Sequence, residues 1–288
     1  MKRILCATDL SPRAALAVDR AIALARQFSA DLRLVHVVDD EQPLELVQVE
    51  TERTQAALEA RIARLDSPPV QATVEIRTGT VFQSIVEAAR TWKADVVVLG
   101  AHRRRILRDV VVGTTIERVI RTAAHPVLMV NTATLVPYEF VLLALDTSEA
   151  SARAVQTAHA LGLLSAAHQI SVVHAFEPLY KGMIGWAGVR QDTIDEYSAT
   201  WEREAKEEIT GFIRQLGYDP AAVSLVTEEG PPFASIKRTL EHVHPHLLVI
   251  GTHGRKGPAR VLLGSVAERV ISELECDILT VPPAAAGH

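Results

Sequence analysis

The chain has 288 residues, a formal net charge of −5, and 48% hydrophobic against 23% charged residues. This balance is typical of a globular protein with an apolar core, and the acidic total argues against a general nucleic-acid binder. The sequence shows neither a signal peptide nor a stretch long enough for a transmembrane helix, and its two cysteines are too few for a disulfide framework. We therefore expect a cytoplasmic protein that binds neither membranes nor nucleic acids.

Apolar runs and helix-period segments alternate from the first residues onward. In the first half, strands are expected at residues 3–8, 31–37, 70–76, 95–99 and 126–130. Ser11 and Pro12 mark the start of the first helix, because serine is a favoured N-cap and proline suits the first helical position. In the second half of the chain, Ser148 takes the same capping place. Nearly continuous aliphatic strands alternating with helices predict an α/β fold with a doubly wound, five-stranded parallel sheet. Ligands of such sheets bind beyond the carboxyl ends of the strands.

Four sequence blocks recur in the same order in the second half. Residues 4–11, 34–37, 96–102 and 113–120 align with residues 141–148, 172–175, 247–253 and 264–271. We interpret this as a domain duplication, with one domain at residues 1–133 and the other at residues 137–283. Copy two is longer because of an insertion at about residues 178–200, which is rich in glycine and apolar side chains. The insertion is either a mobile lid, a partner-binding loop, or a loop packed on its own domain or on the neighbouring domain.

A glycine-rich connection follows the fourth strand of copy two. Residues 251–254 read Gly-Thr-His-Gly, and nine residues later Gly264 and Ser265 open a helix. Glycines let the backbone approach a phosphate, and the amides and dipole of a helix N-terminus attract anions. An ordinary strand-to-helix loop explains the glycines alone equally well. The connection is neither a Walker P-loop nor a dinucleotide fingerprint.

The combined pattern resembles the universal stress protein (UspA) family. It consists of Asp-x-Ser after strand one, His-Val or His-Ala after strand two, and Gly-x-x-Gly-x9-Gly-Ser after strand four. The resemblance covers nearly the whole chain, as a tandem member. It implies a Rossmann-like, nucleotide-binding α/β fold with strand order 3-2-1-4-5 in each domain. It also implies that the two domains pair as a pseudo-dimer through their last strands, at residues 127–130 and 278–281.

The resemblance further implies an ATP site, or one for AMP or ADP, in copy two. Glycines and Ser265 of the loop would hold the phosphates, and the backbone of Ala175 would bond the adenine edge. Asp146 would bind the ribose hydroxyls or lie near a Mg²⁺ ion carried by the phosphates, although an aspartate before a helix is often only a turn residue. No metal site is expected from the protein alone. The assigned residues are Ala144, Leu145, Asp146, Ala175, Gly251, His253, Gly254, Arg255, Gly264, Ser265 and Val266.

Copy one departs from the pattern at Arg103, which replaces the second glycine of the loop. A residue with a Cβ atom resists positive φ, so we expect weaker or altered binding there. The arginines of residues 103–108 either bind a different anion or form a solvated charged stretch. The weaker candidates in copy one are Asp9, Val37, Gly100, Arg103, Gly113 and Thr114.

Three functions remain open from the sequence. The first is an ATP-binding stress-response or signalling protein that works with an unidentified protein partner. The second is a slow ATPase or nucleotidyl transferase, although the chain shows no phosphoryl-transfer constellation. The third is a nucleotide-free interaction scaffold. The sequence does not decide whether two such chains form a homodimer.

Overall fold

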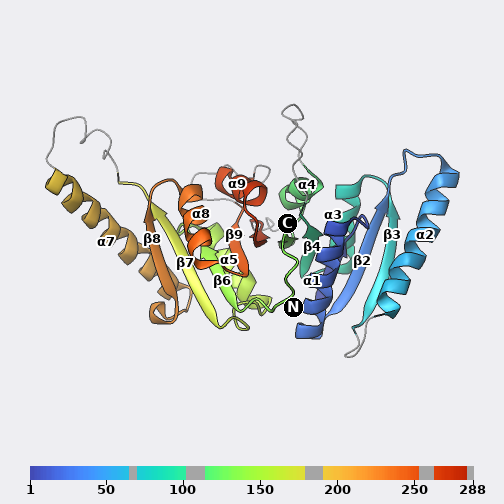
Figure 1. Cartoon of the computed structure of the whole chain (residues 1–288), viewed down its shortest axis with the longest axis horizontal. Coiled ribbons are helices and arrows are strands. Elements are labelled where there is room, and N and C mark those ends of the chain that lie inside the picture. The colour runs from blue at the N-terminus through green and yellow to red at the C-terminus, as the bar shows by residue number, and fades with distance from the viewer. Residues whose placement is uncertain (65–69, 102–113, 179–190, 253–262, 284–288) are drawn as a thin grey trace.

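One continuous sheet of ten strands crosses the whole molecule (Figure 1). The computed structural model describes residues 1–64, 70–101, 114–178, 191–252 and 263–283. Copy one contains β1 (Arg3–Ala7), α1 (Pro12–Phe28), β2 (Asp31–Val38), α2 (Leu44–Ala63), β3 (Ala72–Thr78), α3 (Val81–Trp92), β4 (Val96–Gly100), α4 (Thr115–Thr122) and β5 (Val127–Val130). Copy two contains β6 (Phe140–Ala144), α5 (Glu149–Ala160), β7 (Gln169–Phe176), α7 (Gln191–Gln215), η1 (Pro220–Ala222), β8 (Ser224–Glu229), α8 (Pro232–Val243), β9 (Leu247–Gly251), α9 (Ser265–Glu273) and β10 (Asp277–Val281).

The strand order is β3-β2-β1-β4-β5-β10-β9-β6-β7-β8. Each half therefore has the order 3-2-1-4-5, and its strands pair in parallel. The halves join where β5 and β10 pair antiparallel, with Leu128 opposite Leu279. The predicted doubly wound fold and the pairing through the last strands are both confirmed. The pairing also covers two sheet edges that would otherwise be exposed.

Alternate residues of the inner strands lie in two apolar layers, one on each face of the sheet. Ile4 and Cys6 of β1 belong to the layer that includes buried residues of α1, α2, α5 and α7. Leu5 and Ala7 belong to the layer on the other face, which includes buried residues of α3, α4, α8 and α9. Both copies contribute to each layer, so the core is continuous across the joint. Within the described ranges, no helix has the length and apolar character that crossing a membrane requires.

The first helix of each copy begins where the sequence predicts. Ser11 Oγ accepts a hydrogen bond from the Ala14 amide at 3.2 Å, and Pro12 is the first residue of α1. Ser148 Oγ accepts the corresponding bond from the Ser151 amide at 3.2 Å in α5. These caps hold the first turn of each helix at the carboxyl end of the preceding strand.

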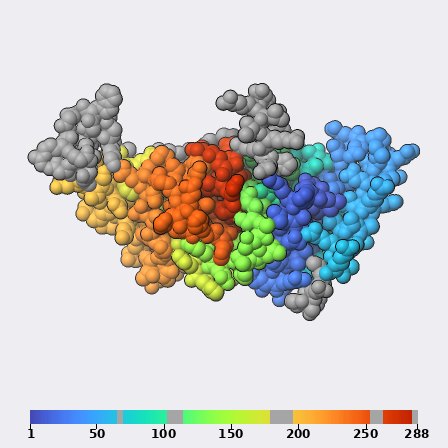
Figure 2. All heavy atoms as spheres, viewed as in Figure 1, coloured from blue at the N-terminus to red at the C-terminus, as the bar shows by residue number. Residues whose placement is uncertain are grey.

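A linker between the copies runs along one face of the molecule, visible as a green strip between the two halves in Figure 2. Its Tyr138 hydroxyl donates to Asp277 Oδ2 at 2.6 Å, and Asn131 donates its amide to Oδ1 of the same carboxylate at 2.9 Å. Arg20 Nε, on α1, lies 3.3 Å from Asp277 Oδ2. The same guanidinium donates to the carbonyls of Thr134 and Val136. This buried network fixes the linker to both copies.

Candidate functional site

The predicted site of copy two lies where the strand order reverses. β6 pairs with β7 on one side and with β9 on the other, and the connections after β6 and β9 lead to α5 and α9. The carboxyl ends of these parallel strands meet at one edge of the sheet, which is the usual ligand position in doubly wound folds. Asp146, Thr252 and Ser265 follow β6, β9 and the loop at this edge.

Asp146 shapes the turn that leads from β6 into α5. Its Oδ1 accepts hydrogen bonds from the Ser148 amide at 3.2 Å and from the Ser151 hydroxyl at 2.6 Å. This is the turn role that the sequence offered as an alternative, so any ribose contact would come in addition to it. The sequence interpretation missed Ser151. Copy one has alanine at the corresponding position, Ala14, so comparing the copies would have identified Ser151.

The ends of the first two strands of copy two are joined by a buried histidine. His174 Nδ1 lies 2.8 Å from the Leu145 carbonyl oxygen, as His36 Nδ1 lies 2.8 Å from that of Thr8 in copy one. Ala144 and Leu145 are buried, so little of their side chains faces solvent. His36 and His174 therefore each have a structural role, which is to join the ends of the first two strands of their copy.

Ala175 is better placed for a backbone contact. It pairs with Glu228 of β8, while the paired part of β6 ends opposite Val173. On the side that faces away from β8, the Ala175 backbone therefore lies beyond the end of the paired part of β6. A ligand at the switch point would approach this edge. Val37 has the same position in copy one, near the end of β2, where it pairs with Arg77 of β3.

Gly251 has a packing role that needs no ligand. A Cβ atom at this position would lie 2.8 Å from the Ala150 carbonyl oxygen in the first turn of α5. In copy one, a Cβ atom at Gly100 would lie 2.6 Å from the Arg13 carbonyl oxygen of α1. Real Cβ atoms essentially never come this close to backbone atoms. The glycine at the end of the fourth strand is therefore explained in both copies by close helix packing, whether or not a phosphate binds.

The two copies differ at the helix that follows the loop. In copy one, Thr114 caps α4: its hydroxyl accepts from the Glu117 amide at 3.3 Å, and Glu117 Oε2 accepts from the Thr114 amide at 3.2 Å. In copy two, Gly264 is the N-cap, and no side chain among the described residues caps α9. Ser265, the counterpart of Thr114, is exposed at the first helical position. Among the described residues, no side chain therefore bonds the first amides of α9, and helix N-termini attract anions.

The base of the copy-two loop is closed by backbone bonds. The Gly264 amide donates to the Thr252 carbonyl at 2.8 Å, and the Thr252 amide donates to the Val281 carbonyl of β10 at 3.0 Å. Both ends of the loop are therefore held at the switch point, and Val266 follows in the first turn of α9. Five predicted residues lie outside the described ranges: His253, Gly254, Arg255, Arg103 and Gly113.

A contact that the sequence did not predict ties the site to α7. Thr147, at the turn after β6, adopts φ 58° and donates its hydroxyl to Glu208 Oε1 at 2.8 Å. In copy one the same turn carries Leu10, with φ 60° and an exposed side chain. The tip of the insertion, residues 179–190, lies outside the described ranges, and the helix α7 follows it.

Neither cysteine is poised for chemistry. Burial raises the pKa of both the Cys6 and the Cys276 thiol from 9.0 to about 12. Both thiols are therefore protonated at neutral pH, and a thiol that stays protonated is a poor nucleophile and metal ligand. Within the described part of the chain, no group of three or more His, Cys, Asp or Glu side chains is arranged to hold a metal ion.

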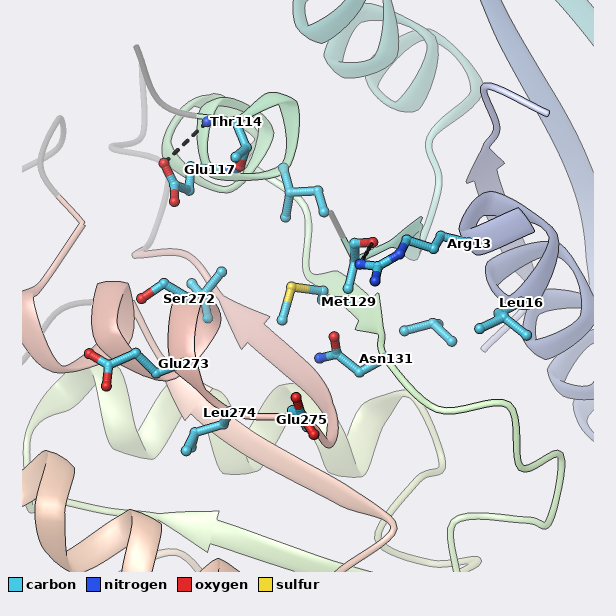
Figure 3. Close-up of a pocket in the computed structure, with 14 residues that line it drawn as sticks. Arg13, Leu16, Thr114, Glu117, Met129, Asn131, Ser272, Glu273, Leu274 and Glu275 are labelled. Atoms are coloured by element: carbon cyan, nitrogen blue, oxygen red, sulfur yellow. Dashed lines mark hydrogen bonds between the residues drawn. The ribbon is translucent and has the colours of Figure 1, made fainter. Parts of the chain in front are cut away.

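A cleft of about 460 Å³ lies between the copies rather than over Asp146 (Figure 3). Arg13 and Leu16 of α1, Thr114 and Glu117 at the start of α4, and Asn131 after β5 form its copy-one walls. The end of α9 and the turn to β10, residues 271–275, form the copy-two wall.

Comparison with known proteins finds one family model that matches both copies. The model of the universal stress protein family matches residues 1–131 and 137–282. A universal stress protein of Synechocystis sp. is 30% identical over 151 residues, which cover 50% of this chain and 97% of that protein. A universal stress protein of Mycolicibacterium smegmatis is 25% identical over 225 residues, which cover 73% of this chain and 68% of that protein.

A solved structure extends the similarity to the whole chain. A universal stress protein from Archaeoglobus fulgidus superposes with a TM-score of 0.71 at 17% identity, covering 97% of this chain and 98% of that one. At this identity the likeness concerns the fold: two domains of the same type in one chain.

Proposed function

We propose, on the premise that this chain belongs to the universal stress protein family, that its second copy binds an adenine nucleotide, ATP in the first instance. In this proposal the nucleotide-bound state acts as a signal that a partner protein reads, in the cytoplasm. The phosphates would lie at the start of α9, where the Ser265 hydroxyl can donate to a phosphate oxygen. A Mg²⁺ ion carried by the phosphates would lie near Asp146.

One observation supports copy two in particular. Thr114 and Glu117 close the start of α4 with a reciprocal capping box, whereas no described side chain caps α9. In copy one the Thr114 amide donates to Glu117 Oε2 and the Glu117 amide donates to the Thr114 hydroxyl. In copy two the Glu268 amide donates instead to the Gly264 carbonyl at 2.9 Å, and no described side chain accepts from the Ser265 amide. An open helix N-terminus at a topological switch point favours an anionic ligand.

The proposed site is connected to the rest of copy two, so a partner protein would detect whether nucleotide is bound. Thr147, next to Asp146, bonds Glu208 in the middle of α7. α7 lies at one end of the molecule (Figure 1), next to β8 at the sheet edge. A ligand that reorders the Asp146 turn would change this contact, which is a local event with a readout at the surface.

The test is calorimetric titration of ATP with Mg²⁺ into wild type and a matched pair of variants, Ser265→Ala and Thr114→Ala. Losing a hydroxyl that donates to a charged phosphate should weaken ATP binding by about tenfold in Ser265→Ala. Thr114→Ala should leave ATP affinity unchanged, because that hydroxyl serves the α4 cap. Equal ATP affinity in wild type and Ser265→Ala would remove Ser265 from the site.

Two further variants address the whole loop. Gly254→Arg, which gives copy two the residue found at Arg103, should abolish ATP binding, whereas Arg103→Gly should retain it. Equal affinity of wild type and Gly254→Arg would overturn the proposed site, and no binding by wild type would favour a nucleotide-free scaffold. Phosphate release, followed in parallel, separates binding from hydrolysis. Multiple turnover that Asp146→Ala abolishes would identify a slow ATPase.

A further inference from the structure

Exposed large apolar side chains gather at one edge of copy one. Of the seven that the described residues contain, two lie in the linker and none lies in copy two. The other five follow β1, β2 and β3, which are parallel neighbours in the sheet, so their carboxyl ends lie side by side. Single exposed apolar side chains are normal on protein surfaces, whereas a cluster of them marks a site of interaction. The five are Leu10 in the turn after β1, Leu44, Leu46 and Val49 in α2, and Val81 at the start of α3.

The first two turns of α2 carry three of these side chains. Leu44, Leu46 and Val49 are 72%, 54% and 45% exposed. Leu46 and Val49 are three residues apart, so they share one side of the helix. The buried residues of α2, on the side that packs on β2 and β3, are Val47, Thr54 and Leu58. α2 thus has one apolar side toward the core and a second one toward solvent.

The corresponding helix of copy two has no second apolar side. α7 follows β7 as α2 follows β2, and it packs on β7 and β8. α2 and α7 lie at opposite ends of the molecule (Figure 1). The exposed residues in the middle of α7 are charged, as on an ordinary solvated helix, and include Glu202, Arg203, Lys206 and Glu207. The fold therefore does not require exposed apolar side chains on this helix, and those of α2 need another explanation.

Negative charge accompanies the apolar side chains of α2. The α2 surface, formed by the exposed side chains of residues 39–52, includes six carboxylates and no lysine, arginine or histidine. Glu50 has a partner, because its Oε1 lies 3.6 Å from His36 Nε2. No cationic side chain in the described ranges forms an ion pair with the other five, which are exposed: Asp39, Asp40, Glu41, Glu45 and Glu52.

This combination of charge and apolar contact decides what the α2 surface fits. Carboxylates beside apolar side chains attract a partner whose own apolar side is flanked by lysine or arginine, and they repel a second copy of the same surface. They also repel the anionic surface of a membrane and the phosphates of a nucleotide. Apolar residues three positions apart on a helix, such as Leu46 and Val49, match the spacing of apolar residues on a second amphipathic helix.

We propose that the α2 surface docks an amphipathic helix of a partner protein, with lysine or arginine residues on either side of its apolar stripe. The partner helix packs on Leu44, Leu46 and Val49, and its cations lie against the carboxylates of residues 39–52. The apolar contacts hold the complex together, whereas the charges speed association and orient the helix. The proposal does not rest on the nucleotide site, which belongs to copy two.

The test follows the fluorescence anisotropy of a labelled synthetic peptide, two repeats of Leu-Lys-Lys-Leu-Leu-Lys-Leu, as the full-length chain is added. Wild type should bind the peptide saturably, with one peptide per chain. The double variant Leu46→Asn with Val49→Asn should bind it about tenfold more weakly, because apolar contact area is lost. Leu135→Asn is the matched control: it changes a leucine of similar exposure, 49%, in the linker and should bind the peptide as wild type does.

The contribution of charge is measured separately. The double variant Glu45→Gln with Glu52→Gln should bind the peptide about threefold more weakly, with a smaller salt dependence than wild type. A peptide with glutamate in place of every lysine should not bind wild type. All four substituted positions of α2 are exposed, so the variants should fold as wild type does.

The proposal is overturned if wild type shows no saturable binding of the basic peptide. It is equally overturned if the Leu46→Asn, Val49→Asn variant binds that peptide as tightly as wild type, or if wild type binds the acidic peptide as tightly as the basic one. Sedimentation equilibrium of the free chain checks a different occupant. A dimer that the Leu46→Asn, Val49→Asn variant dissociates would assign the α2 surface to a second copy of the chain and would overturn the proposal as well.

Discussion

At the scale of single residues, Gly251 illustrates how one residue type can serve two purposes. The sequence motif assigns it to phosphate binding, because glycine allows close approach of a backbone to a ligand. The structure shows that its hydrogen already faces the Ala150 carbonyl oxygen, at a distance that excludes a Cβ atom. The equivalent contact at Gly100 occurs in the copy with an altered loop. The glycine is therefore required by the fold, and nucleotide binding is not needed to explain it.

We expect Gly251→Ala to lower the free energy of unfolding by about 1–3 kcal/mol, because the added methyl forces the start of α5 away from β9. The measurement is urea unfolding without nucleotide. Gly211→Ala is the matched control: Gly211 lies in α7 with nothing within 4 Å of its Cβ position. That change should raise stability by up to about 1 kcal/mol, through helix propensity. Unchanged stability of Gly251→Ala would contradict the packing role.

At the scale of elements, the linker, α1 and β10 meet in one buried polar network. Asp277 has no exposed surface and accepts from Tyr138, Asn131 and Thr132, while Arg20 lies 3.3 Å away. The guanidinium of Arg20 also lies over the Tyr138 ring, 4.4 Å from its centre. Burial and the neighbouring Asp277 carboxylate raise the pKa of Tyr138 well above its ordinary value. The tyrosine therefore remains a hydrogen-bond donor at neutral pH.

We expect Asp277→Ala to cost about 3–5 kcal/mol of stability, because it leaves the Arg20 charge buried without its partner. Urea unfolding measures the effect. Glu228→Ala, which breaks the more exposed pair with Arg238, should cost less than about 1 kcal/mol. Similar costs for the two variants would show that the buried pair is not what holds the linker.

At the scale of the whole molecule, the antiparallel pairing of β5 with β10 turns two five-stranded sheets into one. The apolar layers on both faces continue across this joint. The division of the chain into residues 1–133 and 137–283 remains a proposal, since contacts of the linker reach into both halves. The cleft and the ion pair of Arg121 with Glu268 lie at the same joint, on opposite sides of the pseudo-twofold axis that relates the two copies.

We expect the two halves, produced as separate chains of residues 1–133 and 137–283, to associate as a one-to-one complex when mixed. Each half alone exposes the unpaired edge of β5 or β10, and exposed edges seek pairing. Size-exclusion chromatography with light scattering measures the masses. Two folded halves that stay monomeric after mixing would contradict this expectation. In that case the covalent linker, rather than strand pairing, would keep the copies together.

The repeat, the class of fold and the start of the first helix in each copy could be predicted from the sequence. These features depend on local patterns: aliphatic runs, capping residues such as Ser11 and Ser148, and motifs that recur in order. The strand order and the pairing of the last strands came from the family resemblance, and the structure confirms them. The residues of the nucleotide site remain predictions.

Only the tertiary structure decided the features that join distant parts of the chain. The contact of Thr147 with Glu208, the ion pair of Arg121 with Glu268, and the cleft beside Ser272 all involve residues that are far apart in the sequence. No local pattern encodes which side chains meet across a seam, because that depends on how packed elements are placed in space. The sequence by itself determined two related α/β domains with unequal loops. The packing decided that an ion pair forms on one side of the joint, at Arg121 and Glu268, and that a cleft lies on the other side, beside Ser272.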